Sequence, residues 1–175
     1  MSNGSTVPTK ARYDKARQEA IEILKNVGIS GPPVSPLDVA SHLGLTVSVI
    51  EMPPDHRDVA GFLDVKNKQI FVNQEDPPNR QTFTVAHEIG HYLLHREVIE
   101  AHPDQYELLF RGKMLEAHTP MEQEANCFAA NLLVPEEMLR QYEGLPSSVL
   151  PYLFKVSPEV ISNRRKSIWA EQKPH

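Results

Sequence analysis

Residues 84–95 read TVAHEIGHYLLH and contain two histidines, His87 and His91, four positions apart. On a helix this spacing places both imidazoles on one face, one turn apart. Two neutral nitrogens so placed can bind one metal ion at the ~2.0–2.1 Å that zinc requires. Apolar residues surround the pair on nearly every side, which predicts a buried helix over residues 80–96. Burying histidines without partners is costly, and a metal ion removes that cost.

Glu88 directly follows His87 and can supply the general base that metal-dependent peptide hydrolysis also requires. Its carboxylate can reach a water molecule on the metal and take a proton from it, while the metal acidifies that water and polarises a peptide carbonyl. The H-E-x-x-H pattern is only moderately specific, and the alternative is a surface helix with two solvated histidines. The buried character of this helix favours the metal site.

A third ligand is expected from a second helix, because catalytic zinc sites use three protein ligands and leave one position for water. The helix predicted over residues 119–133 offers two carboxylates, Glu122 and Glu124. Glu122 shares a face with Asn126, whose amide can then accept a hydrogen bond from a ligand histidine. Glu124 lies about 200° further round the helix. Glu122 is therefore the predicted ligand, and Glu124, interpreted as a solvated surface acid, is the alternative.

The two segments together resemble the ImmA/IrrE metallopeptidases. TVAHEIGHYLLH is followed some thirty residues later by E-x-E-A-N-x-F-A-A-x-L-L-V-P. The resemblance covers roughly residues 35–140 and implies a minimal zincin fold. It also implies the roles of four residues: Glu88 as the catalytic acid and base, and a zinc site of His87, His91 and Glu122. Family members cleave or regulate helix-turn-helix repressors of the Xre type, which implies the substrate class.

The expected function is that of a zinc-dependent endopeptidase which cleaves an Xre-type repressor. Manganese is an alternative metal, because sites of two histidines and one glutamate accept both ions. The alternative function is a non-cleaving regulator, or a toxin–antitoxin-like binding partner, of such a repressor. Direct DNA binding by the C-terminal helices rests only on the basic cluster Arg164, Arg165 and Lys166. The net charge of −5 argues against it, so no nucleic-acid partner is expected.

The rest of the chain predicts an α+β fold, a zincin-like domain in which a small antiparallel or mixed sheet packs with helices. Hairpin strands are predicted over residues 60–65 and 69–73. The second is interpreted as an exposed edge strand beside the metal, open to an extended substrate. We expect a flexible tail over residues 1–9, the metallopeptidase domain over 10–145, and a C-terminal helical extension of that domain over 146–175.

The composition is that of a soluble cytoplasmic protein. A chain of 175 residues, 40% of them hydrophobic, is long enough for one domain with its own core. The single cysteine excludes an intrachain disulfide, as suits a reducing compartment. The N-terminus lacks a secretory signal, and no apolar run approaches the ~20 residues that cross a bilayer. We therefore expect a cytoplasmic protein without a membrane partner.

Several other residues lie in or near the two motifs. His95 is interpreted as a helix C-terminal histidine favoured by the helix dipole. Gly90 is interpreted as a position that lets another backbone pack closely, and Cys127 as a small buried residue rather than a ligand. A second electrophile for the scissile carbonyl has four candidates, between which the sequence does not choose: Tyr92, His102, Tyr106 and His118.

Overall fold

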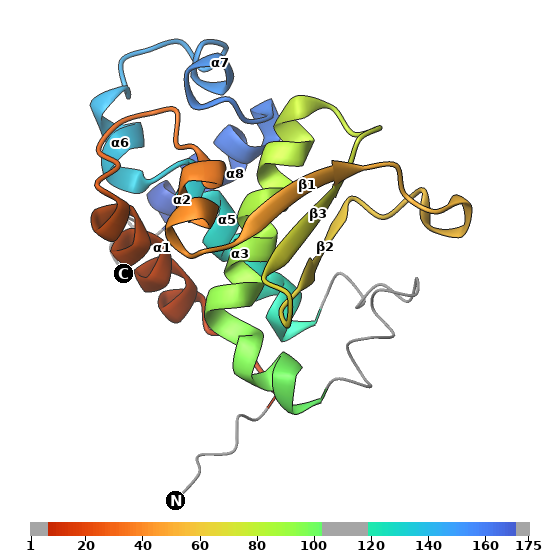
Figure 1. Ribbon diagram of the computed structural model, residues 1–175. Coiled ribbons are helices and arrows are strands. Elements are labelled where there is room, and N and C mark those ends of the chain that lie inside the picture. The colour runs from red at the N-terminus through yellow and green to blue at the C-terminus, as the bar shows by residue number, and fades with distance from the viewer. Residues whose placement is uncertain (1–6, 103–118, 171–175) are drawn as a thin grey trace, which may run out of the picture.

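A small sheet lies on one side of the molecule and most of the helices lie on the other (Figure 1). The computed structural model describes residues 7–102 and 119–170. In chain order its elements are α1 (Tyr13–Val27), α2 (Pro36–His42), β1 (Thr46–Ile50), the 3-10 helix η1 (Pro54–His56), β2 (Gly61–Asp64), β3 (Gln69–Asn73), α3 (Pro78–Ala101), α5 (Pro120–Leu133), α6 (Glu136–Gln141), α7 (Leu150–Phe154) and α8 (Pro158–Ala170). This architecture confirms the predicted α+β class. Within those two ranges, no helix has the length and apolar character that crossing a membrane requires.

Local signals set the helix boundaries that matter for the site. Gly28 ends α1 with a left-handed backbone, φ 81°, a conformation that glycine adopts without steric cost. The Ser35 side chain accepts a hydrogen bond from the backbone N–H of Asp38 at the start of α2. The Thr119 side chain accepts in the same way from the N–H of Glu122. This second cap fixes the first turn of α5, which carries Glu122.

The sheet has the strand order β1–β3–β2. β3 pairs in parallel with β1, from Gln69 opposite Thr46 to Asn73 opposite Ile50, and antiparallel with β2. The prediction that residues 69–73 form an exposed edge strand is therefore wrong, because β3 has a partner on both sides. Addition of a substrate strand to β3 is excluded with it. The hairpin pattern predicted the pairing of β3 with β2, its neighbour in sequence, but not the parallel pairing with β1.

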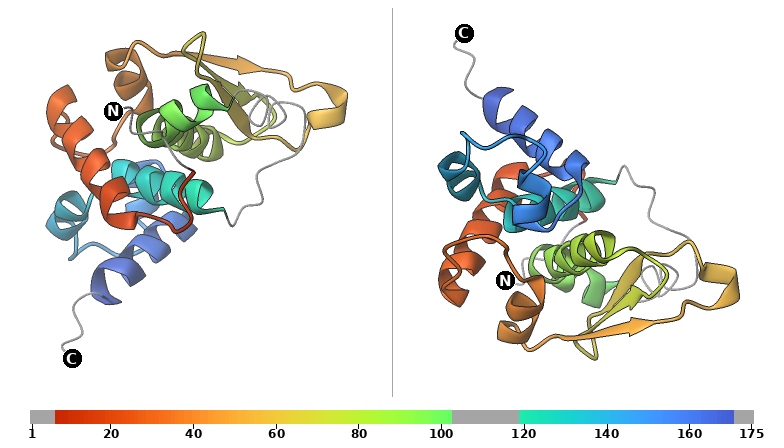
Figure 2. Two further views of the ribbon diagram at one scale, coloured as in Figure 1. Left: turned by 90° about the horizontal axis from the view of Figure 1, so that it is seen from below. Right: turned by 90° about the horizontal axis from the view of Figure 1, so that it is seen from above.

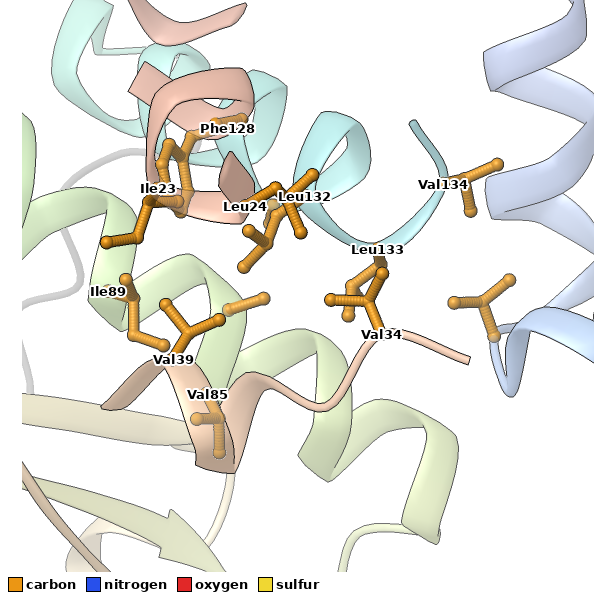
Figure 3. Close-up of a cluster of buried hydrophobic side chains, with 14 of the residues drawn as sticks. Ile23, Leu24, Val34, Val39, Val85, Ile89, Phe128, Leu132, Leu133 and Val134 are labelled. Carbon is orange, nitrogen blue, oxygen red and sulfur yellow. The ribbon is translucent and has the colours of Figure 1, made fainter. Parts of the chain in front are cut away.

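Helix α3 lies between the sheet and the helices α1, α5 and α8 (Figures 1 and 2). It packs against β2 and β3 on one side and against α5 on the other, and α5 packs in turn against α1. Figure 3 shows apolar side chains from four helices meeting in this core, among them Ile23, Val39, Ile89 and Phe128. Full burial of a side chain of this size stabilises the fold by about 1.5–3 kcal/mol. The core therefore fixes α3 and α5 relative to each other.

Gly90 lets α3 and α5 approach closely. A Cβ atom on Gly90 would lie 3.0 Å from Cδ1 of Phe128 and 3.2 Å from Cα of Ala125. Both distances are shorter than ordinary van der Waals contact, so a large side chain here would force the helices apart. The interpretation of Gly90 as a close-packing position is confirmed. The close approach brings the histidine motif against the helix that carries Glu122.

Arg164 belongs to the packing of the C-terminal helices. Its side chain is buried, and its Nε donates a hydrogen bond to the backbone oxygen of Val134, just after α5. Leu150 and Phe154 of α7 are fully buried in the main core. One of the three cations on which the DNA-binding hypothesis rested thus joins α8 to the end of α5.

Candidate active site

Helices α3 and α5 bring three side chains to one point. The Nε2 atoms of His87 and His91 lie 3.0 Å apart. The carboxylate oxygens of Glu122 lie 3.1 Å from Nε2 of His87 and 3.0 Å from Nε2 of His91. One ligand atom from each of these residues falls within 4.8 Å of the others. The three residues that the sequence singled out as metal ligands therefore lie together.

The chemistry of this donor set suits a divalent cation. Tetrahedral ligand atoms at ~2.0–2.1 Å from zinc lie roughly 3.3 Å apart, close to the separations in this group. Burial acts to raise the pKa of Glu122, but hydrogen bonds with His87 and His91 outweigh it and hold that pKa well below its usual range. The carboxylate is ionised at neutral pH, as metal binding requires.

Asn126 supports His87 from the side away from Glu122. Its Oδ1 lies 3.0 Å from Nδ1 of His87, so Nδ1–H donates to the amide oxygen. A ring held through Nδ1 turns Nε2 towards Glu122, where the Nε2 lone pair would bind a metal ion placed between them. The expectation that Glu122 and Asn126 share a face and both approach the histidines is confirmed.

Asn126→Ala is expected to weaken zinc binding about 10–100-fold, the usual cost of losing a hydrogen bond that orients a ligand histidine. The measurement is a zinc competition titration with a chromophoric chelator. Asn131→Ala is the matched control on the same helix, because the Asn131 side chain bonds to the backbone oxygen of Cys127. The control should bind zinc like the wild type. Unchanged zinc affinity in Asn126→Ala would contradict this role.

Glu124 is not one of the three residues whose ligand atoms meet, and its interpretation as a solvated acid is wrong. Its side chain is fully buried. The carboxylate accepts hydrogen bonds from the backbone N–H, Nε and Nη2 of Arg12 at 2.8, 2.9 and 2.8 Å, and faces Nε2 of His95 at 3.0 Å. Burial acts to raise the pKa of Glu124, but these hydrogen bonds lower it to about 2. Its partners, rather than solvent, stabilise the charge.

His95 also lies in a different environment from the one predicted. Helix α3 continues to Ala101, so His95 is inside the helix, and it is only 1% exposed. Its Nδ1 lies 3.1 Å from Nδ1 of His91. Burial, together with the neighbouring His91, lowers the pKa of His95 to about 4, so the ring is neutral at neutral pH. The interpretation as a helix C-terminal cation is wrong.

Glu88 is buried next to the histidine pair, with 8% of its surface exposed. Desolvation raises the pKa of Glu88, whereas His87 and His91 act to lower it. A nearby cation acts in the same direction as the histidines. A carboxyl group balanced in this way is suited to taking up a proton and returning it.

The remaining candidates do not join this group. Tyr92 is buried, and His102 is exposed just beyond the end of α3. Tyr106 and His118 lie outside the described residues. Cys127 is half-buried on α5 and is absent from the group of metal-ligating atoms found among the described residues. A second electrophile is therefore not assigned.

Comparison with known proteins gives a family and a fold. Residues 42–166 match the family model described as the IrrE N-terminal-like domain, Peptidase_M78. This span includes all of α3 and α5 and begins after α1. A solved structure of a Mycobacterium tuberculosis transcriptional regulator superposes with a TM-score of 0.64 at 18% identity, over 93% of this chain and 48% of that chain. At this identity the likeness concerns the fold alone.

Three relatives show how far the similarity extends. "Uncharacterized immunity region protein 2" of Bacillus phage phi105 is 26% identical over 141 residues, 79% of this chain and 80% of that protein. "Radiation response metalloprotease IrrE" of Deinococcus deserti is 32% identical over 141 residues, 79% of this chain and 46% of that protein. "Metallopeptidase ImmA" of Bacillus subtilis is 27% identical over 99 residues, 57% of this chain and 50% of that protein. The match thus spans about half of each of the latter two proteins.

Proposed function

Because the chain belongs to the ImmA/IrrE family of metallopeptidases, we propose that it is a zinc-dependent endopeptidase that cleaves an Xre-type repressor. One observation carries the proposal: His87, His91 and Glu122 meet at one point, with Glu88 buried alongside. Zinc is the proposed metal, with manganese as the alternative. The proposed catalytic unit is residues 10–145, with the C-terminal helices as an extension of it.

The chemistry divides between the metal and Glu88. A bound divalent cation supplies Lewis acidity, which polarises a peptide carbonyl and makes a water molecule more acidic. His87 and His91 would hold the cation through the lone pairs on Nε2, and Glu122 would supply a negative charge. A carboxylate oxygen of Glu88 takes the proton of the attacking water as the new C–O bond forms. It returns that proton to the amide nitrogen as the C–N bond breaks.

A repressor is proposed as the substrate on two grounds. The paired motifs resemble those of proteins that cleave or regulate Xre-type repressors. A relative is named for a phage immunity region, which hints at a repressor target. Cleavage of such a repressor places the enzyme's action in the cytoplasm.

The test is to search the neighbouring reading frames for an Xre-type repressor, to incubate that repressor with the zinc-loaded chain, and to separate the products on a denaturing gel. Two repressor fragments are expected. A chelator should abolish cleavage, because the carbonyl is then no longer polarised, and added zinc should restore it. A parallel sample restored with manganese distinguishes the two metals. A repressor that is bound but stays intact with either metal supports a non-cleaving partner instead.

A further inference from the structure

A network of hydrogen bonds connects Nδ1 of His91, the ring nitrogen opposite the proposed metal site, to the residue before α1. Nδ1 of His91 lies 3.1 Å from Nδ1 of His95, and Nε2 of His95 lies 3.0 Å from Oε2 of Glu124. Glu124 in turn accepts three hydrogen bonds from Arg12, the residue just before α1. The links run through the interior, since the side chains of His95 and Glu124 are both fully buried.

The direction of each hydrogen bond follows from the chemistry of the partners. Glu124 receives three N–H donors from Arg12, so it is a carboxylate and can only accept. The Nε2 of His95 must therefore carry a proton. Because Arg12 already neutralises Glu124, a second positive charge on the fully buried ring would be costly, so the ring is neutral and has a lone pair on Nδ1. That lone pair can accept only if Nδ1 of His91 carries a proton. Nε2 of His91, which faces Glu122 and His87, is then the nitrogen whose lone pair would bind the metal ion.

We propose that Arg12, Glu124 and His95 are positioning residues that hold His91 in the tautomer and orientation required for metal binding. The inference rests on the metal site proposed above, and it identifies residues outside the ligand set that raise the affinity of that site for the metal ion. The two histidines are supported differently. A neutral amide, Asn126, accepts from His87, whereas His91 faces His95, whose own partner is the buried Glu124 in its ion pair with the partly exposed Arg12. Hydrogen bonds to charged groups are stronger than those between neutral groups, so the bond to Glu124 holds the His95 ring firmly in place opposite His91.

This network connects the N-terminal segment to the metal site. Arg12 lies outside residues 42–166, the span that matches the family, and its side chain is 42% exposed. Helix α1, which follows it, packs along α5. A segment outside the matched span therefore contributes to metal binding in this chain. The competing account is that the Arg12–Glu124 pair only attaches α1 to α5, in which case its loss lowers stability without changing the metal affinity of the folded protein.

The wild type alone allows a first test. Long-range ¹H–¹⁵N correlation spectra of the zinc-loaded chain at neutral pH report which ring nitrogen of each histidine carries the proton. His95 is expected as a neutral ring protonated on Nε2, and His91 as a ring protonated on Nδ1. A His95 protonated on Nδ1 would reverse the direction of the network and overturn the proposal.

Two substitutions of similar size at His95 separate positioning from packing. His95→Leu removes the acceptor for His91 and should weaken zinc binding about 10–100-fold. His95→Asn places an amide oxygen near the former Nδ1 and should restore most of that loss. A purely structural role predicts equal zinc affinities for the two folded variants, and a higher stability for the leucine variant, because leucine is the better residue for a buried helix position. The readout is the zinc dissociation constant of the folded protein, with the visible spectrum of bound Co²⁺ as a check on ligand geometry.

Arg12→Met extends the test to the far end of the network, where the partly exposed side chain makes failure to fold less of a concern. It should weaken zinc binding by less than His95→Leu does. Arg140→Met is the matched control, since it removes the cation of an ion pair with Glu136 on α6. The control should bind zinc like the wild type. If His95→Leu and Arg12→Met both bind zinc as tightly as the wild type, the positioning role is wrong. If the wild type itself binds no zinc, the proposed metal site fails first.

Discussion

Glu88→Gln is expected to slow repressor cleavage at least ~10²-fold, the usual scale for the loss of a general base. Glutamine keeps the size and hydrogen-bonding reach of glutamate but cannot take a proton from the attacking water. Glu88 is not one of the three residues whose ligand atoms meet, so the variant should keep both its fold and its zinc. Lost cleavage with full zinc occupancy is the signature of a proton-transfer role.

The measurement is single-turnover cleavage of the repressor, together with the zinc content of the same sample. Glu100→Gln is the matched control, because it makes the same change at an exposed position of α3. The control should cleave at the wild-type rate. If Glu88→Gln relieves repression in cells as well as the wild type does, the protein acts by binding and the peptidase proposal fails.

Glu122→Ala is expected to lose zinc far more readily than Glu124→Ala. Structural zinc sites with four ligands bind with about 10–16 kcal/mol, so the loss of one ligand corresponds to roughly 10²–10³-fold in affinity. Glu124 acts only through His95 and His91, and loss of such an outer partner costs about 10–100-fold. The two carboxylates are two residues apart on one helix, so each variant serves as the control for the other.

Zinc competition titrations on both purified variants provide the comparison. Circular dichroism of each zinc-free variant shows whether the protein is folded, because Glu124→Ala also leaves His95 and Arg12 without an acceptor. If Glu124→Ala proves the weaker zinc binder of two folded proteins, Glu122 is not the third ligand. Glu124 would then take that place, and the network behind His91 would need another explanation.

The part of the site that depends on helix geometry could be predicted from the sequence. His87 and His91 are one turn apart, and Glu122 and Asn126 are one turn apart on the second helix, so the regular rise of a helix places each pair on one face. The packing of these two helix faces against each other depends on the whole fold and cannot be read from the spacing of residues within either helix. Gly90 was the available sign, because a missing side chain in a buried helix marks the close approach of another backbone.

The parts that depend on pairing between distant segments could not be predicted. Arg12 is 112 residues from Glu124, and no spacing rule links them. Without a visible partner, a glutamate within a helix is reasonably interpreted as solvated, since unpaired carboxylates are rarely buried. The place of β3 in the sheet was missed for the same reason. A hairpin joins neighbours in sequence, whereas parallel strands need a long connection that leaves no local pattern.

The most direct measurement is mass spectrometry of the repressor after incubation with the zinc-loaded chain in ¹⁸O-labelled water. Hydrolysis of a peptide bond places an oxygen from water in the new carboxyl group. A zinc endopeptidase should give two fragments from a single cut, with ¹⁸O in the new C-terminus of the N-terminal fragment and none in a sample treated with chelator. A repressor that forms a complex with the chain but keeps its full mass and carries no label would show that the protein does not act as a peptidase on it.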